Sequence, residues 1–218
     1  MNKMHEQSQK PRTPARRRTM SSIEWDEIYR TRRLDAVPWH SGQPDRRLVQ
    51  LINQKRIPKG RVLDMCSGDG TNSIYLASKG FDVFGVDISG TAVRIARQRC
   101  EKRSVFCAYE VGDVLSLTPR KKFDFVFDRG CFHHMSGDDK PRYVSTVKRL
   151  LRPSGKFFLL CFSDKNPPYK KNLSKEDIRG YFGHDFRIHF IRDSVHREPP
   201  RGTKRYLYAS FMELAGKP

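Results

Sequence analysis

The sequence predicts an α/β fold, a doubly wound and mostly parallel seven-stranded sheet with helices on both faces, preceded by an N-terminal helical cover. Two observations carry this prediction. From residue 61 onward, short apolar segments alternate with segments of helical periodicity. Four of these apolar segments also end in an aspartate. No run approaches the roughly 18 uncharged apolar residues of a membrane helix, which excludes a transmembrane protein.

Two helices are expected ahead of the sheet. Ser21 and Glu24 have the spacing of a capping box, and the residues that follow supply an apolar face. A second helix is expected to open at Pro44, because proline is favoured at the first helical position. An irregular loop that contains Trp39 connects them.

Basic residues dominate the first 20 positions, which have almost no large apolar side chains, so residues 1–20 are expected to form a disordered basic tail. An organelle transit peptide is an alternative for this Arg-rich stretch, whereas an apolar region for secretion is missing from it. Residues 21–218 are expected to form a single domain, with the helical cover at 21–58 and the α/β core at 59–218.

The core is expected to alternate strands and helices, as in a parallel sheet. The expected strands are 61–65, 81–86, 105–111, 123–127, 156–162, 186–191 and 206–212. The expected helices are 71–79, a helix capped by Ser89, 140–151 and a helix from Ser174 to about Tyr181. The first four strands are followed by Asp64, Asp87, Asp113 and Asp128. Ligands of such sheets bind at the carboxyl ends of the strands, so these acids predict a binding site there.

The loop 66–70, Cys-Ser-Gly-Asp-Gly, follows the first strand and is glycine-rich. It could hold a dinucleotide, or it could be a tight turn without a ligand. Ser73 stands where the dinucleotide fingerprint has its third glycine. Asp64 and Asp69 flank the glycines, and carboxylates repel a pyrophosphate. S-adenosylmethionine carries a sulfonium and an ammonium and no phosphate, so the acidic loop favours this methyl donor.

Further acids fit the other parts of this donor. Asp87 lies 19 residues beyond Gly68, the usual offset of an acid that accepts hydrogen bonds from ribose hydroxyls. Asp113 can accept a hydrogen bond from the adenine amino group. The predicted donor site comprises Trp25, Tyr29, Trp39, Asp64, Gly68, Gly70, Asp87, Ile88, Asp113, Val114 and Asp128. S-adenosylmethionine is the cofactor that these residues predict, and no metal is expected.

These segments resemble the successive motifs of the class I methyltransferases, which have a Rossmann-like fold. The resemblance rests on residues 62–70, 86–87, 112–113 and 123–128. A narrower resemblance, to the thiopurine S-methyltransferase-like group, rests on residues 25–29, 38–40, 123–130 and 167–169. Members of that group act on thiols, halides and tellurite. Cys66 departs from the family pattern, which commonly has glycine at this position.

The resemblance also implies roles near the methyl acceptor. The arginine that Arg129 matches lies at the substrate site of thiopurine-type enzymes, and a cation there lowers the pKa of a thiol acceptor. The N-terminal segment covers the donor in that family, and Trp39 matches an aromatic residue that lines the site. His133 follows Arg129 on the same loop and is a candidate weak base. We therefore predict catalytic roles for Arg129 and His133.

The cysteines predict a reduced protein. The five cysteines include no CxxC pair and are odd in number, so neither a zinc ribbon nor a disulfide scaffold is expected. Reduced thiols suit a cytoplasmic protein, and we expect a monomer. Cys131 is expected to be a structural free cysteine, because methyl transfer needs no covalent enzyme intermediate.

The predicted function is methyl transfer from S-adenosylmethionine, by in-line displacement, to a small soft nucleophile such as a thiol, selenol, halide or tellurite. The formal charge of +19 keeps a methyltransferase of RNA or another anionic macromolecule open as an alternative. The basic residues that motivate it near the C-terminus are Arg192, Arg197, Arg201, Lys204 and Arg205.

Two local features permit different functions. Cys66 in the glycine loop allows a scaffold or sensor that binds the donor without catalysis. Residues 166–169, Asn-Pro-Pro-Tyr, match a signature of amino-group methyltransferases that act on flipped adenines. In those enzymes the signature follows the fourth strand, whereas here it follows the fifth, and Asp128 to Cys131 occupy the fourth-strand position.

Overall fold

The computed structural model describes residues 19–167, 172–198 and 202–216. Its strands are β1 (Arg61–Met65), β2 (Asp82–Asp87), β3 (Ala108–Val111), β4 (Phe123–Arg129), β5 (Leu151–Phe162), β6 (Phe186–Glu198) and β7 (Thr203–Leu214). Its α-helices are α1 (Ser22–Thr31), α2 (Arg46–Asn53), α3 (Thr71–Ser78), α4 (Gly90–Glu101), α5 (Asp139–Leu150) and α6 (Lys175–Phe182). Short 3₁₀ turns cover Leu34–Ala36 and Phe132–His134.

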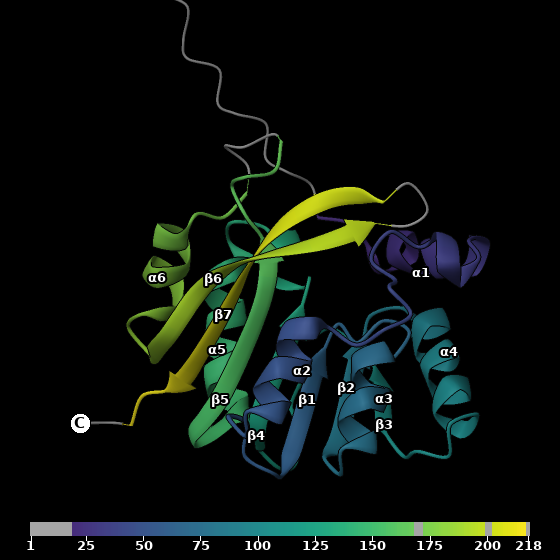
Figure 1. Cartoon of the computed structure of the whole chain (residues 1–218), viewed down its shortest axis with the longest axis horizontal. Coiled ribbons are helices and arrows are strands. Elements are labelled where there is room, and N and C mark those ends of the chain that lie inside the picture. The colour runs from purple at the N-terminus through teal and green to yellow at the C-terminus, as the bar shows by residue number, and fades with distance from the viewer. Residues whose placement is uncertain (1–18, 168–171, 199–201, 217–218) are drawn as a thin grey trace, which may run out of the picture.

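The seven strands form one sheet in the order β3-β2-β1-β4-β5-β7-β6, and within the described ranges only β7 runs antiparallel to its neighbours. The predicted doubly wound, mostly parallel sheet is therefore confirmed (Figure 1). The chain builds outward from β1 to β3 and then returns to place β4 on the other side of β1. The order of the strands reverses between β1 and β4, which is where such sheets bind ligands.

Helices cover both faces of the sheet. Leu48 of α2, Ile74 of α3 and Val93 of α4 belong to one apolar cluster, and Val147 of α5 and Phe182 of α6 belong to the other. Side chains of a strand point alternately to the two faces, so β4 supplies apolar residues to both clusters. Because α2 packs on the sheet beside α3, it forms part of the core layer, whereas the sequence places it in the cover.

The first residue of each of the two N-terminal helices is set by a capping side chain. Ser21 and Glu24 form the predicted capping box at α1. The prediction that Pro44 opens α2 is wrong by two residues, because Asp45 is the N-cap. Its carboxylate accepts hydrogen bonds from the backbone N–H groups of Arg47 (2.8 Å) and Leu48 (3.3 Å), so the helix begins after it.

The strands that differ most in length from their predictions are β3, β5, β6 and β7. β3 is shorter and begins at Ala108. β5 begins at Leu151 instead of residue 156, and in the added segment the register with β4 shifts and Ser154 has a φ of +57°. β6 and β7 stay paired from Phe186 opposite Leu214 out to Glu198 opposite Thr203, well beyond the expected 186–191 and 206–212.

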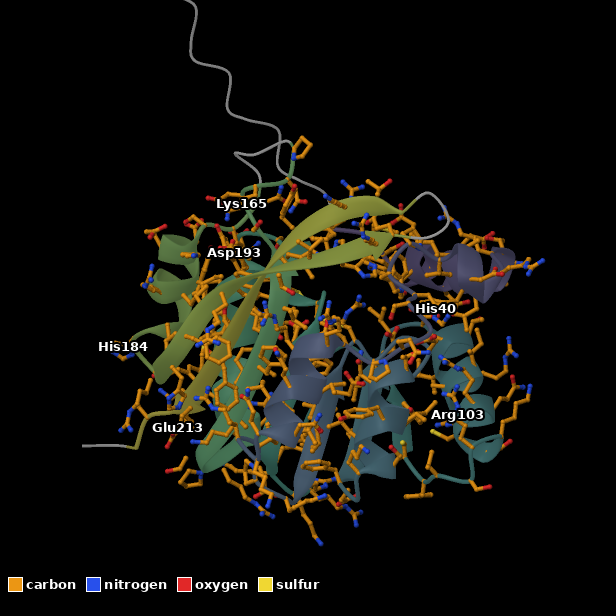
Figure 2. All side chains as sticks on the ribbon, viewed as in Figure 1. His40, Arg103, Lys165, His184, Asp193 and Glu213 are labelled. Carbon is orange, nitrogen blue, oxygen red and sulfur yellow. A yellow bond between two sulfur atoms is a disulfide. The ribbon has the colours of Figure 1, made fainter. Side chains whose placement is uncertain are left out.

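The extension of β6 and β7 forms an arm, which we define as residues 192–198 and 203–207. Figure 1 shows the arm crossing above the sheet toward α1. Lys165, after β5, pairs with Asp193 at the start of the arm (2.6 Å; Figure 2), and this contact lowers the pKa of Asp193. Asp193 also accepts, through its backbone carbonyl, a hydrogen bond from Arg47 of α2 (3.1 Å).

None of the helices in the described residues has the length and apolar character required to cross a membrane.

Candidate functional site

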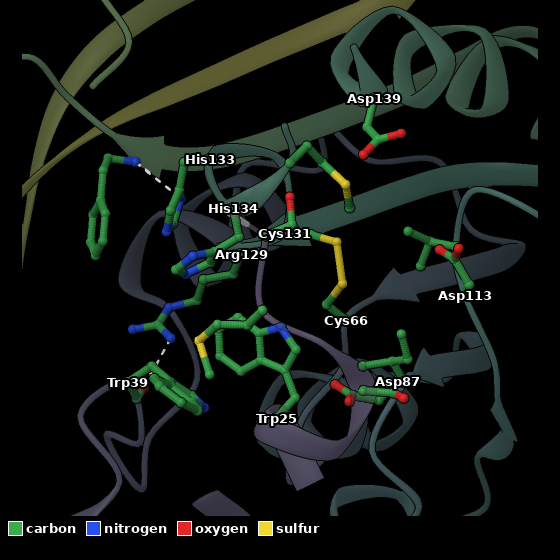
Figure 3. A pocket seen from close by; sticks show the side chains of 18 of the residues that line it. Trp25, Trp39, Cys66, Asp87, Asp113, Arg129, Cys131, His133, His134 and Asp139 are labelled. Atoms are coloured by element: carbon green, nitrogen blue, oxygen red, sulfur yellow. Dashed lines mark hydrogen bonds between the residues drawn. A yellow bond between two sulfur atoms is a disulfide. The ribbon is translucent and has the colours of Figure 1, made fainter. Parts of the chain in front are cut away.

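A cavity of about 340 Å³ lies at the carboxyl edge of the sheet, under α1 and the arm (Figure 3). Its lining includes Trp25, Tyr29, Trp39, Cys66, Asp87, Ile88, Asp113, Val114, Arg129, Cys131, His133, His134, Leu160, Phe162, His196 and Leu207. A smaller cavity of about 40 Å³ adjoins it, and its lining includes Tyr29, Trp39, Cys66, Asp64, Gly68 and Asp69. Nine of the predicted site residues line the larger cavity, and Asp64 and Gly68 line the smaller one.

Asp87 organises the glycine loop. Its carboxylate accepts hydrogen bonds from the backbone N–H groups of Gly68 (2.8 Å) and Ser89 (2.9 Å). Burial raises the pKa of Asp87, and these two N–H groups act against that effect. Gly68 has a φ of +54°, and a Cβ there would lie 2.6 Å from the Tyr29 hydroxyl oxygen. The position therefore favours glycine, because its φ is positive and the Tyr29 hydroxyl of the cover approaches the loop closely there.

An apolar slot lies beside Asp87 at the ends of β2 and β3. Its lining comprises the apolar Ile88 and Val114 together with Asp113. The Asp113 carboxylate accepts a hydrogen bond from the backbone N–H of Leu115 (2.9 Å), which holds the acid in place. Apolar walls with one fixed polar group are typical of a site for a planar ring.

Three aromatic residues cover this side of the cavity. The rings of Trp25 and Trp39 lie 5.5 Å apart and those of Tyr29 and Trp39 lie 5.9 Å apart, in edge-on arrangements. The Trp39 indole N–H donates a hydrogen bond to the Tyr29 hydroxyl (2.7 Å). Aromatic faces attract cations, so the cover suits a positively charged ligand.

Two acids attach the cover to the core. Asp26 of α1 accepts hydrogen bonds from the Ser89 hydroxyl (2.6 Å) and the Thr91 backbone N–H (2.8 Å) at the start of α4. These bonds lower the pKa of Asp26, with the Ser89 contact contributing most. Asp69 of the glycine loop pairs with His40 of the cover (2.6 Å) and with Arg99 of α4. Asp69 therefore faces a guanidinium and an imidazole of the chain itself.

Besides Gly68, three predicted donor residues do not line the larger cavity: Asp64, Gly70 and Asp128. Asp64 is buried beside the smaller cavity, where it accepts a hydrogen bond from the Ser73 hydroxyl (2.6 Å). Burial raises the pKa of Asp64 to about 7. Gly70 lines neither cavity and is required for packing, since a Cβ there would lie 2.5 Å from the Tyr109 hydroxyl oxygen.

Asp128 also differs from its prediction as a donor ligand. It is fully buried and lines neither cavity. Its carboxylate accepts hydrogen bonds from the backbone N–H groups of Cys131 (2.7 Å) and Phe132 (2.9 Å) and from the Tyr143 hydroxyl. Asp128 therefore stabilises the loop after β4. Because side chains alternate along a strand, Asp128 points into the core while its neighbour Arg129 points into the cavity.

Arg129 lies at the other end of the cavity (Figure 3). Its Nη1 donates a hydrogen bond to the Trp39 carbonyl (3.0 Å), and its Nη2 donates one to Nδ1 of His196 (3.1 Å). The Asp45 carboxylate lies 3.5 Å from its Nε. The cover, the arm and the N-terminus of α2 thus converge on one guanidinium.

His133 has a defined proton position. Its ring stacks on Phe162 (4.0 Å between centroids), and its Nδ1 accepts a hydrogen bond from the Phe162 backbone N–H (3.2 Å). A neutral imidazole that accepts at Nδ1 carries its proton on Nε2. This arrangement favours a hydrogen-bond donor over the weak base that the sequence predicts.

A disulfide joins Cys66 and Cys131, so the prediction of a reduced, free Cys131 is wrong. The two cysteines follow β1 and β4, which are adjacent in the sheet, and their Cα atoms lie 5.7 Å apart although they are 65 residues apart in sequence. Cys100, Cys107 and Cys161 are free and buried. Across the described ranges, no cluster of His, Cys, Asp and Glu could hold a metal ion.

Comparison with known proteins reveals the family. The family described as "Methyltransferase domain" matches residues 62–155. An uncharacterized methyltransferase of Schizosaccharomyces pombe is 32% identical over 106 residues, which span 48% of this chain and 73% of that protein. The chain belongs to the class I S-adenosylmethionine-dependent methyltransferases.

Two similarities of this methyltransferase extend over more of the chain. A "Probable thiol methyltransferase 2" of Arabidopsis thaliana is 27% identical over 161 residues, 71% of this chain and 70% of that protein. A solved structure described as "Conversion of a Disulfide Bond into a Thioacetal Group during Echinomycin Biosynthesis" has a TM-score of 0.79 and 26% identity, over 89% of this chain and 93% of that one. The resemblance to the thiol methyltransferase group is therefore confirmed.

S-adenosylmethionine is the cofactor of this methyltransferase, and the cavity fits it. The carboxylate of Asp87, the apolar slot and the aromatic cover lie around one cavity. A ribose, a planar base and a sulfonium are the groups that these three features suit.

Sequence reasoning missed several residues of the methyltransferase cavity and its supports, above all Asp45 and His196. Asp45 carried a usable signal, because an aspartate directly after a proline and before an apolar helix is a typical N-cap. His196 carried none, since it lies among alternating charged residues and reaches Arg129 only through the extension of β6.

Proposed function

We propose that this methyltransferase moves the methyl group of S-adenosylmethionine to a small soft nucleophile: a thiol, selenol, halide or tellurite. The observation that carries the proposal is the position of Arg129, a cation at one end of the cavity whose other end suits the donor. Bound S-adenosylmethionine supplies an electrophilic methyl group on a sulfonium.

On the donor side, we assign Asp87 to the ribose hydroxyls and Asp113 to the adenine amino group. Ile88 and Val114 enclose the adenine ring in the apolar slot. Trp25, Tyr29 and Trp39 face the sulfonium and exclude water from the cavity. Such positioning is the main contribution that a protein makes to an in-line displacement.

On the acceptor side, Arg129 stabilises the anionic form of the nucleophile. A nearby cation lowers the pKa of a thiol and holds a halide or oxyanion by charge. His133 donates a hydrogen bond through Nε2, because Nδ1 is engaged by Phe162. Because Arg129 lowers the pKa of a thiol acceptor, the thiol loses its proton to water, and no side-chain base is needed.

Two observations favour a small acceptor over RNA. Residues of α1 and of the arm, including Trp25 and Leu207, line the cavity. They leave less room for a nucleotide of a polymer to enter than for a small molecule. The amide of Asn166, from the adenine-type signature, binds the backbone of β7: its Nδ2 donates to the Tyr206 carbonyl (2.6 Å) and its Oδ1 accepts from the Tyr206 N–H (2.8 Å). Pro168 and Tyr169 of that signature, and Arg201, lie outside the described residues.

The test is a labelled methyl-transfer assay with small thiols, a selenol, iodide, tellurite and RNA in parallel. We expect transfer to at least one small acceptor, and Arg129→Ala to lower kcat/KM by about 100-fold. Arg94→Ala, an exposed position on α4, is the matched control and should change nothing. Turnover of RNA alone, or full activity of Arg129→Ala, contradicts the proposal. An increase in Tm on addition of S-adenosylhomocysteine shows separately that the donor site of a variant is intact.

A further inference from the structure

We propose that His196 of the arm is a positioning residue that, as a neutral imidazole, holds Arg129 at the acceptor end of the cavity. The inference rests on the proposed function, because Arg129 is the group that His196 orients. His196 lines the cavity and touches Arg129 from β6, a strand at the far edge of the sheet from the donor site.

The two contacts of the His196 ring fix its protonation. Nε2 lies 3.1 Å from the Pro38 carbonyl oxygen, and Nδ1 lies 3.1 Å from Nη2 of Arg129. A carbonyl oxygen only accepts, so Nε2 carries the proton. A guanidinium only donates, so Nδ1 must offer its lone pair. Both contacts exist together only in the neutral Nε2–H form.

Arg129 keeps donors for a ligand while it is held. A guanidinium has five N–H groups. In the described part of the chain, Trp39 accepts one from Nη1, His196 accepts one from Nη2, and Asp45 faces Nε. One N–H on each Nη therefore remains for an acceptor anion. Partners from the cover, the arm and α2 restrict the rotation of a side chain that is only 16% exposed.

The charges around His196 support the neutral form. Burial lowers the pKa of His196 and the Arg129 guanidinium lowers it further, whereas the Pro38 carbonyl, Glu198 and Asp45 act in the opposite direction. Arg205, opposite His196 on β7, pairs with Glu198 (2.9 Å) and offsets that charge. An imidazolium would point a proton at the guanidinium, so acid breaks the contact with Arg129. The acceptor site then loses its fixed cation as the pH falls.

Steady-state kinetics over pH 5–9 with the best small acceptor test this role. We expect His196→Ala to raise the KM for the acceptor by about 10-fold and leave the affinity for S-adenosylhomocysteine unchanged. His196→Asn keeps an acceptor atom near Nδ1 and does not titrate, so it should restore most of the affinity and flatten the acid side of the kcat/KM profile. His189→Ala, on the same strand and outside the cavity, is the matched control. Equal effects of His196→Ala and His189→Ala overturn the proposal.

A measurement without turnover separates this inference from the proposed function. Long-range ¹H–¹⁵N spectra of the imidazole nitrogens report the tautomer and pKa of each histidine. We expect His196 in the Nε2–H form at pH 7, and we expect Arg129→Ala to raise its pKa because a neighbouring cation is removed. An Nδ1–H tautomer, or a pKa that Arg129→Ala leaves unchanged, contradicts the inference. Absence of methyl transfer to every small acceptor would contradict the proposed function alone.

Discussion

The two ends of the cavity are built in different ways. On the donor side, the carboxylate of Asp87 binds N–H groups 2 and 19 residues away in sequence. On the acceptor side, Arg129 binds residues 90 and 67 positions away, and His196 binds Pro38 across 158 residues. The part of the donor side around Asp87 therefore forms with the first strands of the sheet, whereas the acceptor side forms only when the cover and the arm dock on them.

This difference predicts that substitutions at the two ends of the cavity will have different effects. Changes on the donor side remove hydrogen bonds inside the core of the fold, so they should weaken donor binding strongly and reduce stability as well. Changes on the acceptor side and in the cover break contacts between segments that each retain their own structure. Apart from the loss of Arg129 itself, their effects should be smaller: changes in the partners of Arg129 should lower acceptor affinity, and changes in the cover should permit local opening and, through it, a modest loss of donor affinity.

The largest effect is expected from Asp87→Ala. The substitution removes the acceptor of two backbone N–H groups and, in our assignment, of the ribose hydroxyls, so the dissociation constant for S-adenosylhomocysteine should rise about 100-fold. Titration calorimetry measures it. Asp82→Ala is the control, since Asp82 lies at the exposed opposite end of the same strand. Equal losses in both variants would show that charge in general, and not the position of Asp87, holds the donor.

The next effect concerns the stability of the ligand-free protein and its dependence on pH. Burial raises the pKa of Asp64 to about 7, and the carboxylates of Asp128 and Asp87 add to this. A folded-state pKa above the ordinary value means that ionisation disfavours the folded state, by an amount that grows as the pH rises to about 7. Asp64→Asn removes the charge and still accepts from Ser73. We expect its Tm to exceed that of the natural protein by about 2–4 °C per kcal/mol relieved, and by clearly more at pH 8.5 than at pH 5, where only part of the ionisation cost has developed.

Differential scanning fluorimetry at the two pH values measures this effect. Asp82→Asn is a suitable control, because its carboxylate is exposed and its loss should shift Tm little at either pH. If Asp64→Asn changes Tm equally at pH 5 and pH 8.5, the amide alters packing and the carboxylate carries no ionisation cost.

The donor side was also the part that could be predicted from the sequence. The alternation of strands and helices, the acids at strand ends and the caps at Ser21, Ser89 and Ser174 are local patterns, and the structure contains them. It also places Asp87 and Asp113 on one cavity. Asp128 follows the same pattern, yet its side chain supports a loop, because a strand end does not determine which way a side chain points.

The acceptor side could not be predicted in the same way. The strand extension that carries His196, residues 192–198, contains four charged residues and a single apolar one, a composition that resembles a solvated loop until β7 pairs with it. The disulfide between Cys66 and Cys131 depends on the adjacency of β1 and β4, which no spacing of cysteines reveals. These contacts exist only in the folded chain, so on the acceptor side the sequence suggested Arg129 and His133 but none of the residues that hold Arg129.

The smallest effect is expected at the contact between α1 of the cover and the start of α4. Asp26 attaches α1 to the start of α4 through Ser89 and Thr91, and it makes no contact with the sheet in the described hydrogen bonds. Asp26→Ala should therefore loosen the cover by about 1 kcal/mol, the cost of a lost cap. Donor affinity should fall about 5-fold, because the cover must dock before it encloses the donor. The Tm should change little.

Limited trypsin digestion resolves this loosening. The exposed Arg30 and Arg32 lie in and directly after α1, so cleavage there should accelerate in Asp26→Ala and be suppressed again by S-adenosylhomocysteine. Glu27→Ala is the matched control, since Glu27 is on the same helix and pairs only with Arg30 among the described hydrogen bonds of its carboxylate. A large fall in Tm for Asp26→Ala would mean that the cover and the core unfold together, and the contrast between a self-contained donor side and a docked acceptor side would then fail.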